Sequence, residues 1–237
     1  MTRTSYPVRP SERLWGAIRI WTILFLLSSA AAMAAVGYRI WLLRSLPEYS
    51  YMDEMSFIPE GVPGADIEIF TSLGGGLAYV ITYIVSAILV LIWYLRSVRN
   101  AHALSNGVET SPKWAIWWFI IPLVSWWKPY SMTSELWRSS LAPDRWKGLS
   151  DPALLRWWWG AVLVGGLAFA VGNALSRSAA TAGQLIIADS VSIGGYAVHM
   201  VAGVLFLGIA GPVSRRQTAL ISAGRVAPPP PQPTWAA

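Results

Sequence analysis

Four long apolar runs dominate the pattern of hydrophobic and polar positions along the chain. Each run has at least 19 residues without a charged side chain, and the four cover residues about 20–38, 69–95, 157–176 and 190–213. A helix of about 20 residues crosses the hydrocarbon core of a bilayer. Because backbone groups in lipid must bond to one another, the runs predict four transmembrane helices. We expect Ser11 and Glu12 to begin the first helix and Pro212 to end the last.

A fifth apolar stretch, residues 113–140, is too short and too interrupted to span. Fourteen residues lie between the two lysines that flank its apolar core, and as a helix they cover about 21 Å. Pro122 breaks the helical hydrogen-bond pattern. We expect a short helix over 113–121, capped by Ser111, and a second over 130–140. The sequence thus predicts an all-α integral membrane protein, a four-span helix bundle with a Pro-broken, Trp-rich interfacial or re-entrant helix pair between spans 2 and 3.

The placement of Lys and Arg predicts the orientation of the spans. With a cytoplasmic N-terminus and four spans, fifteen of the 18 basic residues lie inside and three outside, whereas a fifth span would abolish this bias. The predicted organisation is a cytoplasmic segment at 1–19, a membrane domain at 20–213 and a cytoplasmic, Pro-rich tail at 214–237. The first run also resembles the core of a signal peptide, but its length favours an uncleaved anchor.

Composition supports the membrane class and excludes several kinds of chemistry. Hydrophobic residues make up 54% of the chain and charged residues 13%, against roughly 25% charged in soluble domains. The net charge of +6 does not indicate nucleic-acid binding, because the bases flank apolar runs. With no Cys, a thiolate metal site and a Cys nucleophile are excluded. Twelve of the 15 Trp fall at the predicted cytoplasmic boundary, where indoles prefer to lie.

Two segments between and after the spans have compositions of their own. The loop at 46–71 is acidic and contains three prolines. It lacks metal-ligand spacing, so a solvated outside loop is favoured over a cation site at Asp53 and Glu54. The Pro-rich tail after Val226 favours polyproline II backbone. A disordered terminus is the preferred interpretation, and a docking peptide for an aromatic groove is the alternative.

His199 falls near the middle of the last predicted span, and a titratable group at that depth is a functional candidate. The favoured interpretation is a neutral, structural imidazole that bonds across the bundle, for instance to Tyr83 or Ser86. The two histidines have no zinc-binding spacing, and no ordered Ser-His-Asp set or nucleophile elbow is present. We therefore expect no metal, no cofactor and no catalytic residue.

The central region resembles a known family through three segments, which are "RNA" at 99–101, "WWFIIPLVSWWKPYSMTSELWRSS" at 117–140 and "LLRWWW" at 154–159. They are similar to the bacterial membrane family called domain of unknown function 4328. The resemblance is dense over 94–159 and extends over about 73–213. It implies a polytopic membrane protein and brings no activity, cofactor or catalytic residue. The family pattern has Asn where this chain has Ser125, which can still donate to backbone freed at Pro122.

The candidate site is a basic and aromatic cluster at the predicted cytoplasmic boundary. The end of the second helix and the broken segment should meet there, and the candidate residues are Arg96, Arg99, Asn100, Lys128, Glu135, Trp137 and Arg138. Such a cluster suits an anionic headgroup. The alternative is that the bases only set topology and that Asn100 caps backbone opened by Pro122. Glu135 and Arg138, three residues apart, are expected to form an ion pair.

The favoured function is a non-enzymatic module that binds anionic membrane lipid or a protein partner at its cytoplasmic face. The resemblance implies a multi-pass protein of the bacterial cytoplasmic (inner) membrane, and the charge bias places the N- and C-termini in the cytoplasm. One alternative is a small transporter or channel that uses the bundle interior near His199. The other is a membrane enzyme acting on a lipid-linked substrate, with Glu135 as its base.

Overall fold

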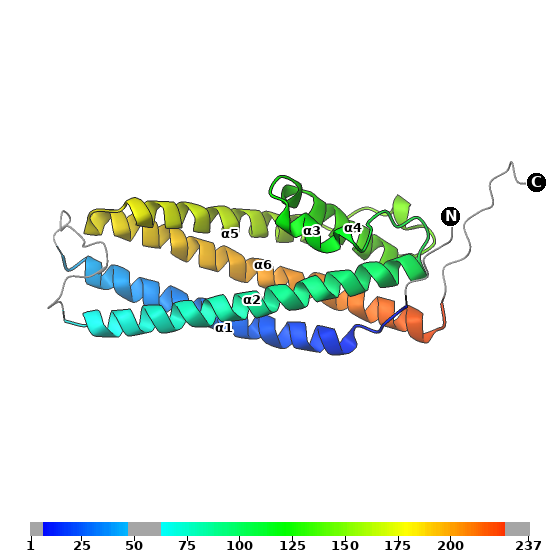
Figure 1. Cartoon of the computed structure of the whole chain (residues 1–237), viewed down its shortest axis with the longest axis horizontal. Helices are drawn as coiled ribbons and strands as arrows, with labels where there is room; N and C mark the ends of the chain where they lie inside the picture. Colours follow the sequence, from blue (N-terminus) through cyan, green and yellow to red (C-terminus); the bar gives the residue numbers. More distant parts are fainter. Residues whose placement is uncertain (1–6, 47–62, 226–237) are drawn as a thin grey trace, which may run out of the picture. The chain divides into compact units, whose positions relative to one another are not determined.

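The protein is all-helical in the computed structural model, which describes residues 7–46 and 63–225 (Figure 1). Within these residues there are two 3-10 turns, no strand and six α-helices. The α-helices are α1 Glu12–Leu43, α2 Ala65–Leu104, α3 Trp114–Ile120, α4 Lys128–Leu141, α5 Ala153–Ser178 and α6 Ala182–Ser222. The 3-10 turns are η1 Val124–Trp126 and η2 Trp146–Gly148. The all-α prediction is therefore confirmed for the described residues.

Four of the helices, α1, α2, α5 and α6, are each long and apolar enough to cross a membrane. They contain the four predicted spans, and α2 and α6 are longer than those spans, at 40 and 41 residues. A helix of 40 residues is about 60 Å long, whereas the hydrocarbon core is about 30 Å thick. The helices define a multi-pass membrane protein.

The break in the central segment lies where the sequence predicts it. Ile121 has extended backbone, with φ −73° and ψ 115°, because the proline ring that follows disfavours helical geometry. Ser125 Oγ donates to the carbonyl oxygen of Pro122 at 2.7 Å, as expected. Ser111 does not cap α3. Its carbonyl oxygen accepts from Trp114 N–H at 3.0 Å, but the cap position is Lys113 and no side chain bonds there.

The expected helix stop at Pro212 is wrong, because α6 continues through it to Ser222. A proline inside a membrane helix is tolerated where neighbouring helices hold the backbone on either side. Here the next turn is anchored by side chains: Ser214 Oγ accepts from Trp93 Nε1 at 2.8 Å, and Gln217 bonds to α2 and α4. Tertiary hydrogen bonds thus hold the part of α6 that follows Pro212.

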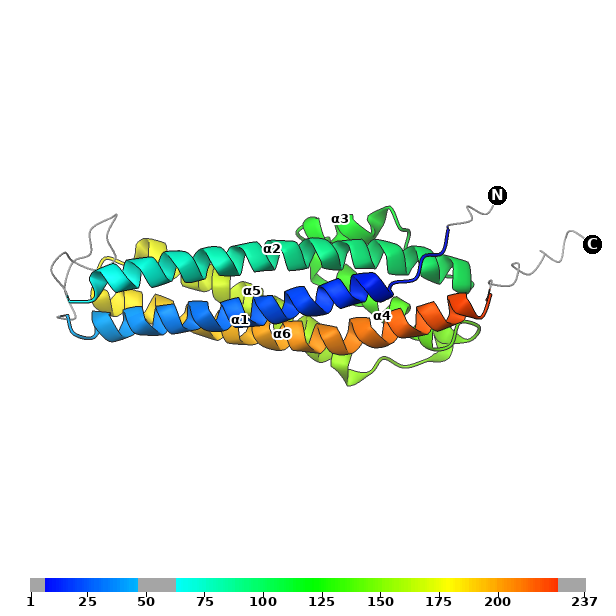
Figure 2. The same cartoon turned by 90° about the horizontal axis from the view of Figure 1, so that it is seen from below.

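Within the described residues the chain forms two compact units. Unit 1 comprises 7–19, 87–156 and 205–225, and unit 2 comprises 20–46, 63–86 and 157–204. In unit 1, α3 and α4 lie side by side (Figure 1), and in Figure 2 other helices partly cover them. Asp53 and Glu54, where a cation site was the disfavoured alternative, lie within 47–62, and the Pro-rich tail lies within 226–237; both segments are outside the described residues.

Each unit has its own aromatic core. In unit 1 the indole of Trp93 packs edge-on against Phe206, with ring centroids 5.5 Å apart, and Trp93 is fully buried. In unit 2 Tyr79 and Phe169 both pack edge-on against Tyr196, with centroids 4.8 Å apart in each pair. Perpendicular pairs place the positive edge of one ring on the negative face of the other. The rings of both cores are therefore oriented by electrostatic attraction as well as packed together.

Candidate functional site

The polar core of unit 1 is built around Asn100, which is completely buried. Its Oδ1 accepts from the backbone N–H of Arg9 at 3.0 Å, and its Nδ2 donates to the carbonyl oxygen of Arg9 at 3.0 Å. The side-chain amide therefore pairs with the extended N-terminal segment as a neighbouring strand would. Arg96 adds a hydrogen bond to the carbonyl oxygen of Pro10 at 3.2 Å. The prediction that Asn100 caps backbone opened by Pro122 is wrong.

Gln217 fixes the orientation of this amide and was not singled out from the sequence. Its Oε1 accepts from Asn100 Nδ2 at 3.2 Å. Its Nε2 donates to Ser97 O at 3.1 Å and to Ser140 Oγ at 3.2 Å. Three helices, α2, α4 and α6, thus meet in one buried network with no charged member. The only signal in the sequence was a polar residue after Pro212 in a helix that was expected to have ended.

Glu135 is buried on α4 and holds the loop that precedes α3. One carboxylate oxygen accepts from Glu109 N–H, and the other accepts from Thr110 N–H at 3.0 Å and from Thr110 Oγ1. The expected ion pair with Arg138 is wrong. A carboxylate that accepts three hydrogen bonds in a buried position acts as a structural clamp, since its lone pairs are already engaged.

Arg138 instead belongs to a second cluster that centres on Asp151. The guanidinium lies 3.3 Å from the Asp151 carboxylate, which also accepts from Ser134 Oγ at 2.6 Å and Tyr130 OH at 3.1 Å. Arg138 also lies over the ring of Trp146, 5.6 Å from its centroid. Burial, together with the hydrogen bond to Asp151, raises the pKa of the Tyr130 phenol. This cluster ties the segment after α4 back onto that helix.

The remaining candidate residues are spread over the surface of unit 1. Arg99 is exposed, and Lys128 Nζ lies 4.9 Å from the ring centroid of Trp118. Trp137 is half-buried beneath Arg216, whose guanidinium carbon lies 6.0 Å from its ring. No hydrogen bond or ion pair in the described part of the chain joins any two of the seven candidates. The single basic pocket expected from the sequence is therefore not assembled from these side chains.

A different feature of unit 1 is more pronounced than that expected pocket. Six large side chains on α3 and η1 and beside them are each at least half exposed. We call this set the aromatic face, and it consists of Trp114, Trp117, Ile120, Leu123, Trp126 and Trp127. Lys113 precedes it and Lys128 follows it. An exposed apolar patch of this kind marks a surface that contacts lipid or protein.

In unit 2, His199 packs among aromatic rings. It stacks on Phe169 with centroids 5.0 Å apart and lies 6.3 Å from the ring of Tyr83. Its Nδ1 is buried and has no hydrogen-bond partner among the described residues. The predicted bond to Tyr83 or Ser86 is wrong, and Ser86 Oγ donates to Trp21 O at 3.2 Å. The absence of a side chain at Gly165 makes room for this packing, because a Cβ on Gly165 would lie 3.0 Å from the imidazole of His199.

An ion pair that the sequence analysis missed joins α1 to α6 in unit 2. Arg39 pairs with Asp189 through two nitrogens, and the Nε–Oδ2 distance is 2.8 Å. Asp189 is almost fully buried, so its charge requires this partner. Glu68, also buried, accepts from Ser72 Oγ at 2.6 Å. No group of three or more metal-ligating side chains occurs in the part of the chain that the structure describes.

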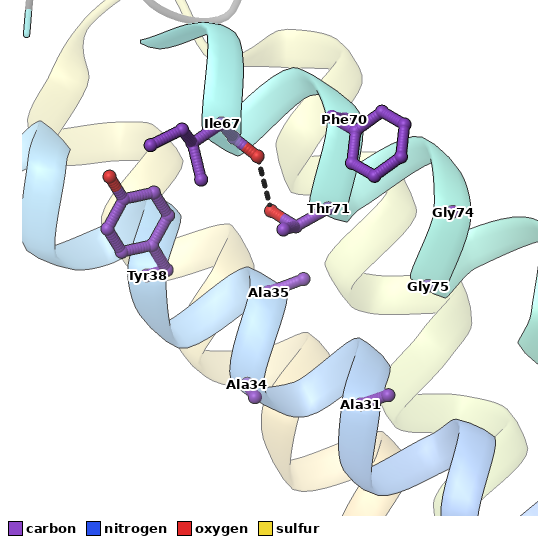
Figure 3. Close-up of a pocket in the computed structure, with 9 residues that line it drawn as sticks. All are labelled: Ala31, Ala34, Ala35, Tyr38, Ile67, Phe70, Thr71, Gly74 and Gly75. Atoms are coloured by element: carbon purple, nitrogen blue, oxygen red, sulfur yellow. Dashed lines mark hydrogen bonds between the residues drawn. The ribbon is translucent and has the colours of Figure 1, made fainter. Parts of the chain in front are cut away.

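A groove of about 480 Å³ lies between α1 and α2 in unit 2 (Figure 3). Its lining is apolar except for one threonine and one tyrosine hydroxyl, and consists of Ala31, Ala34, Ala35 and Tyr38 of α1 and Ile67, Phe70, Thr71, Gly74 and Gly75 of α2. Its volume falls in the range of small-ligand sites, about 300–1,000 Å³. No pattern in the sequence indicated this groove, because the small residues that form it are on separate helices.

Four long apolar helices define the class, an all-helical multi-pass membrane protein. The sequence model of the family described as "Domain of unknown function (DUF4328)" matches residues 65–210. Because the match covers more than half of the chain, the chain belongs to this family, and the expected resemblance is confirmed. No curated protein and no solved structure matches the chain.

Proposed function

We propose that the chain is a non-enzymatic membrane module that inserts its aromatic face into one membrane surface and binds anionic lipid beside it. The observation that supports this is the exposure of the face: Leu123 is 76% and Trp126 62% exposed. Tryptophan favours the membrane–water boundary, where the ring contacts acyl chains and the indole N–H stays hydrated. In this proposal α3 and η1 form an interfacial or re-entrant segment, as the broken helix pattern predicts.

The two lysines that flank the aromatic face supply the attraction for anionic lipid. Each basic residue near an anionic leaflet contributes about 1 kcal/mol. Arg138 is excluded from this role because Asp151 neutralises it, and Asn100 is excluded because it is buried. The proposed lipid-binding bases are therefore Lys113 and Lys128. Of these two, only Lys128 is among the seven candidates named from the sequence.

The proposed orientation places unit 1 and both chain ends on the cytoplasmic side of a bacterial inner membrane. The support is the charge bias of fifteen basic residues against three. The enzyme alternative loses support, since the carboxylate of Glu135 is engaged by three donors. No specific observation supports the transporter alternative, because His199 packs within an aromatic cluster.

Spin-label accessibility tests the depth of the aromatic face. The chain has no Cys, so the single variants Leu123→Cys and Ser150→Cys, the latter at an exposed position, can each carry one nitroxide. We expect the label at 123 to be accessible to oxygen and protected from a water-soluble nickel complex, and the label at 150 to show the reverse. Equal access of the nickel complex to both labels would refute insertion. Reaction of the Ser150→Cys variant with an impermeant reagent outside intact cells would refute the orientation.

Native mass spectrometry tests the lipid preference with a charge-matched control. The Lys113→Ala, Lys128→Ala double variant should lose phosphatidylglycerol that the parent retains. The Arg145→Ala, Lys147→Ala double variant removes the same charge from exposed positions of unit 1 and should retain it. Equal lipid retention in both variants would refute lysine-dependent lipid binding. A copurifying protein that is lost only from the first variant would identify the face as a protein-docking surface instead.

A further inference from the structure

We propose that the groove between α1 and α2 in unit 2 binds one acyl chain of a phospholipid, whose anionic headgroup lies beside Trp41 and Arg44. This site is separate from the aromatic face and rests only on the chain being a membrane protein. Three features carry the proposal: the helices part beside a close crossing, the lining offers no polar group to a ligand, and the end of α1 carries an exposed indole and an exposed cation.

The shape of the groove comes from glycines of α2 that have different surroundings. Gly75 faces α1 so closely that a Cβ on it would lie 3.4 Å from Ala32 Cα. Gly74, which also lines the groove, has nothing within 4 Å of the corresponding position. The helices therefore meet at Gly75 and leave open space beside Gly74. Figure 3 shows Gly74 and Gly75 on one wall of the groove, opposite the alanines of α1.

The lining selects hydrocarbon over a polar ligand. Its polar side chains are Thr71 and Tyr38. Thr71 Oγ1 is already engaged with its own helix, at 2.8 Å from Ile67 O and 3.0 Å from Glu68 O, and Tyr38 OH donates to Gly64 O at 3.5 Å. A polar ligand that left water for this groove would lose hydrogen bonds without replacement, at a cost of about 1–3 kcal/mol for each group. An acyl chain has no such cost, because it exchanges one hydrocarbon environment for another.

The end of α1 supplies the chemistry of a headgroup site. The ring of Tyr38, which lines the groove, stacks on Trp41 with centroids 5.8 Å apart and an interplanar angle of 17°. Trp41 is 65% exposed, and the exposed Arg44 follows the last residue of α1. Indoles concentrate at the level of lipid headgroups, and a guanidinium binds phosphate with two parallel hydrogen bonds. The groove and its rim thus match the apolar and anionic parts of one lipid.

A helix from a second copy fits this groove less well than an acyl chain. Tight pairing of membrane helices needs a flat surface of small residues. Here Phe70 and Ile67 stand beside the small residues and are 80% and 59% exposed. Large side chains at the edge leave a slot for a chain and hold a second helix away from the alanines.

Neighbouring glycines provide a matched pair of variants. Gly74→Leu fills the groove, whereas Gly76→Leu adds the same side chain at a position that does not line it. Neither Cβ meets another atom within 4 Å, and leucine favours the helix over glycine, so both variants should fold. The probe is phosphatidylglycerol with a photoreactive diazirine on its acyl chain, added to nanodiscs, with adducts mapped by mass spectrometry.

We expect adducts on residues 31–38 and 67–75 in the parent and in Gly76→Leu, and a loss of about tenfold in Gly74→Leu, the factor that corresponds to about 1.4 kcal/mol. Unchanged adducts in Gly74→Leu, or an equal loss in both variants, would overturn the proposal. Arg44→Ala should lower the yield with phosphatidylglycerol more than with phosphatidylcholine, and an equal change with both lipids would overturn the headgroup assignment. Efficient disulfide formation between copies of Ala34→Cys would overturn the lipid and identify a second copy as the occupant.

Discussion

Replacing Gln217 with Met tests whether the buried amide network of unit 1 stabilises the fold. Met has a similar volume and an unbranched side chain, so packing is largely kept while three hydrogen bonds are lost. A buried hydrogen bond contributes about 1 kcal/mol net, which gives a loss of about 3 kcal/mol. Because this net value already includes the cost of desolvating the bonded groups, the expected loss in unfolding free energy is about 3 kcal/mol.

The neighbouring residue supplies the control for this measurement. Thr218 is buried, and its Oγ1 has no hydrogen-bond partner in the described residues. Thr218→Val removes that hydroxyl without breaking a bond, so its unfolding free energy should match or exceed that of the parent.

Unfolding by titration with dodecyl sulfate in mixed micelles, followed by tryptophan fluorescence, gives both free-energy differences. A thermal scan should place the midpoint of Gln217→Met about 6–12 °C below that of the parent. If Gln217→Met were as stable as Thr218→Val, the network would contribute no stability and the reasoning would fail.

Three other contacts can be tested by single substitutions. Glu135→Ala should speed hydrogen exchange at the amides of Glu109 and Thr110, measured by mass spectrometry, because both N–H groups lose their acceptor; the exposed Glu109→Ala should leave exchange at Thr110 unchanged. Gly211→Ala should lower the melting temperature by placing a Cβ 2.9 Å from the Trp15 ring, at a cost of about 1–3 kcal/mol, whereas Gly208→Ala meets only Leu154 at 3.4 Å and should be neutral or stabilising. Tyr130→Phe should cost about 1 kcal/mol at neutral pH. The pKa of Tyr130 is raised in the fold, so the stability that its hydroxyl contributes is complete below the ordinary tyrosine pKa of about 10 and declines above it. The unfolding free energies of parent and variant, measured from denaturation curves, should therefore converge as pH rises. A difference that widens with pH would contradict this.

Sequence patterns predicted the features that depend on local geometry. The length of a charge-free run identifies a helix that can cross a membrane, because the bilayer imposes that length. The break at Ile121 follows from the proline ring after it. Neither feature depends on which other parts of the chain lie nearby.

The contacts of polar side chains were not predictable in the same way. Glu135 and Arg138 share a helical face, and a local rule therefore paired them. In the structure each has a partner more distant in the sequence, Thr110 for Glu135 and Asp151 for Arg138. Asn100 bonds to Arg9, 91 positions away. Burial made the difference, since a buried carboxylate needs several hydrogen-bond donors, and the backbone amides of Glu109 and Thr110 together with the Thr110 hydroxyl supply them.

Helix α2 shows how such polar contacts can replace apolar burial in a membrane protein. None of the residues in its most apolar 18-residue window is buried. Apolar side chains gain little by exchanging lipid for protein, so packing between membrane helices relies on small residues and hydrogen bonds. In unit 2, α2 is attached to α1 by Thr82 and Ser28, whose hydroxyls are 2.6 Å apart, and by the close approach at Gly75.

At its other end, in unit 1, α2 is held by the buried amide of Asn100 and by the hydroxyl of Tyr94, which bonds to Thr133 Oγ1 at 2.7 Å. Exposed isoleucines lie along α2 between these polar and small residues, for example Ile81 and Ile88. Their main effect is to make the outer surface of the helix apolar and thus compatible with lipid. Exchange of either for valine should leave stability unchanged, whereas loss of a hydroxyl or amide partner should not. The stability of this helix therefore depends on a few polar and small residues, and its long apolar surface is left available to bind lipid.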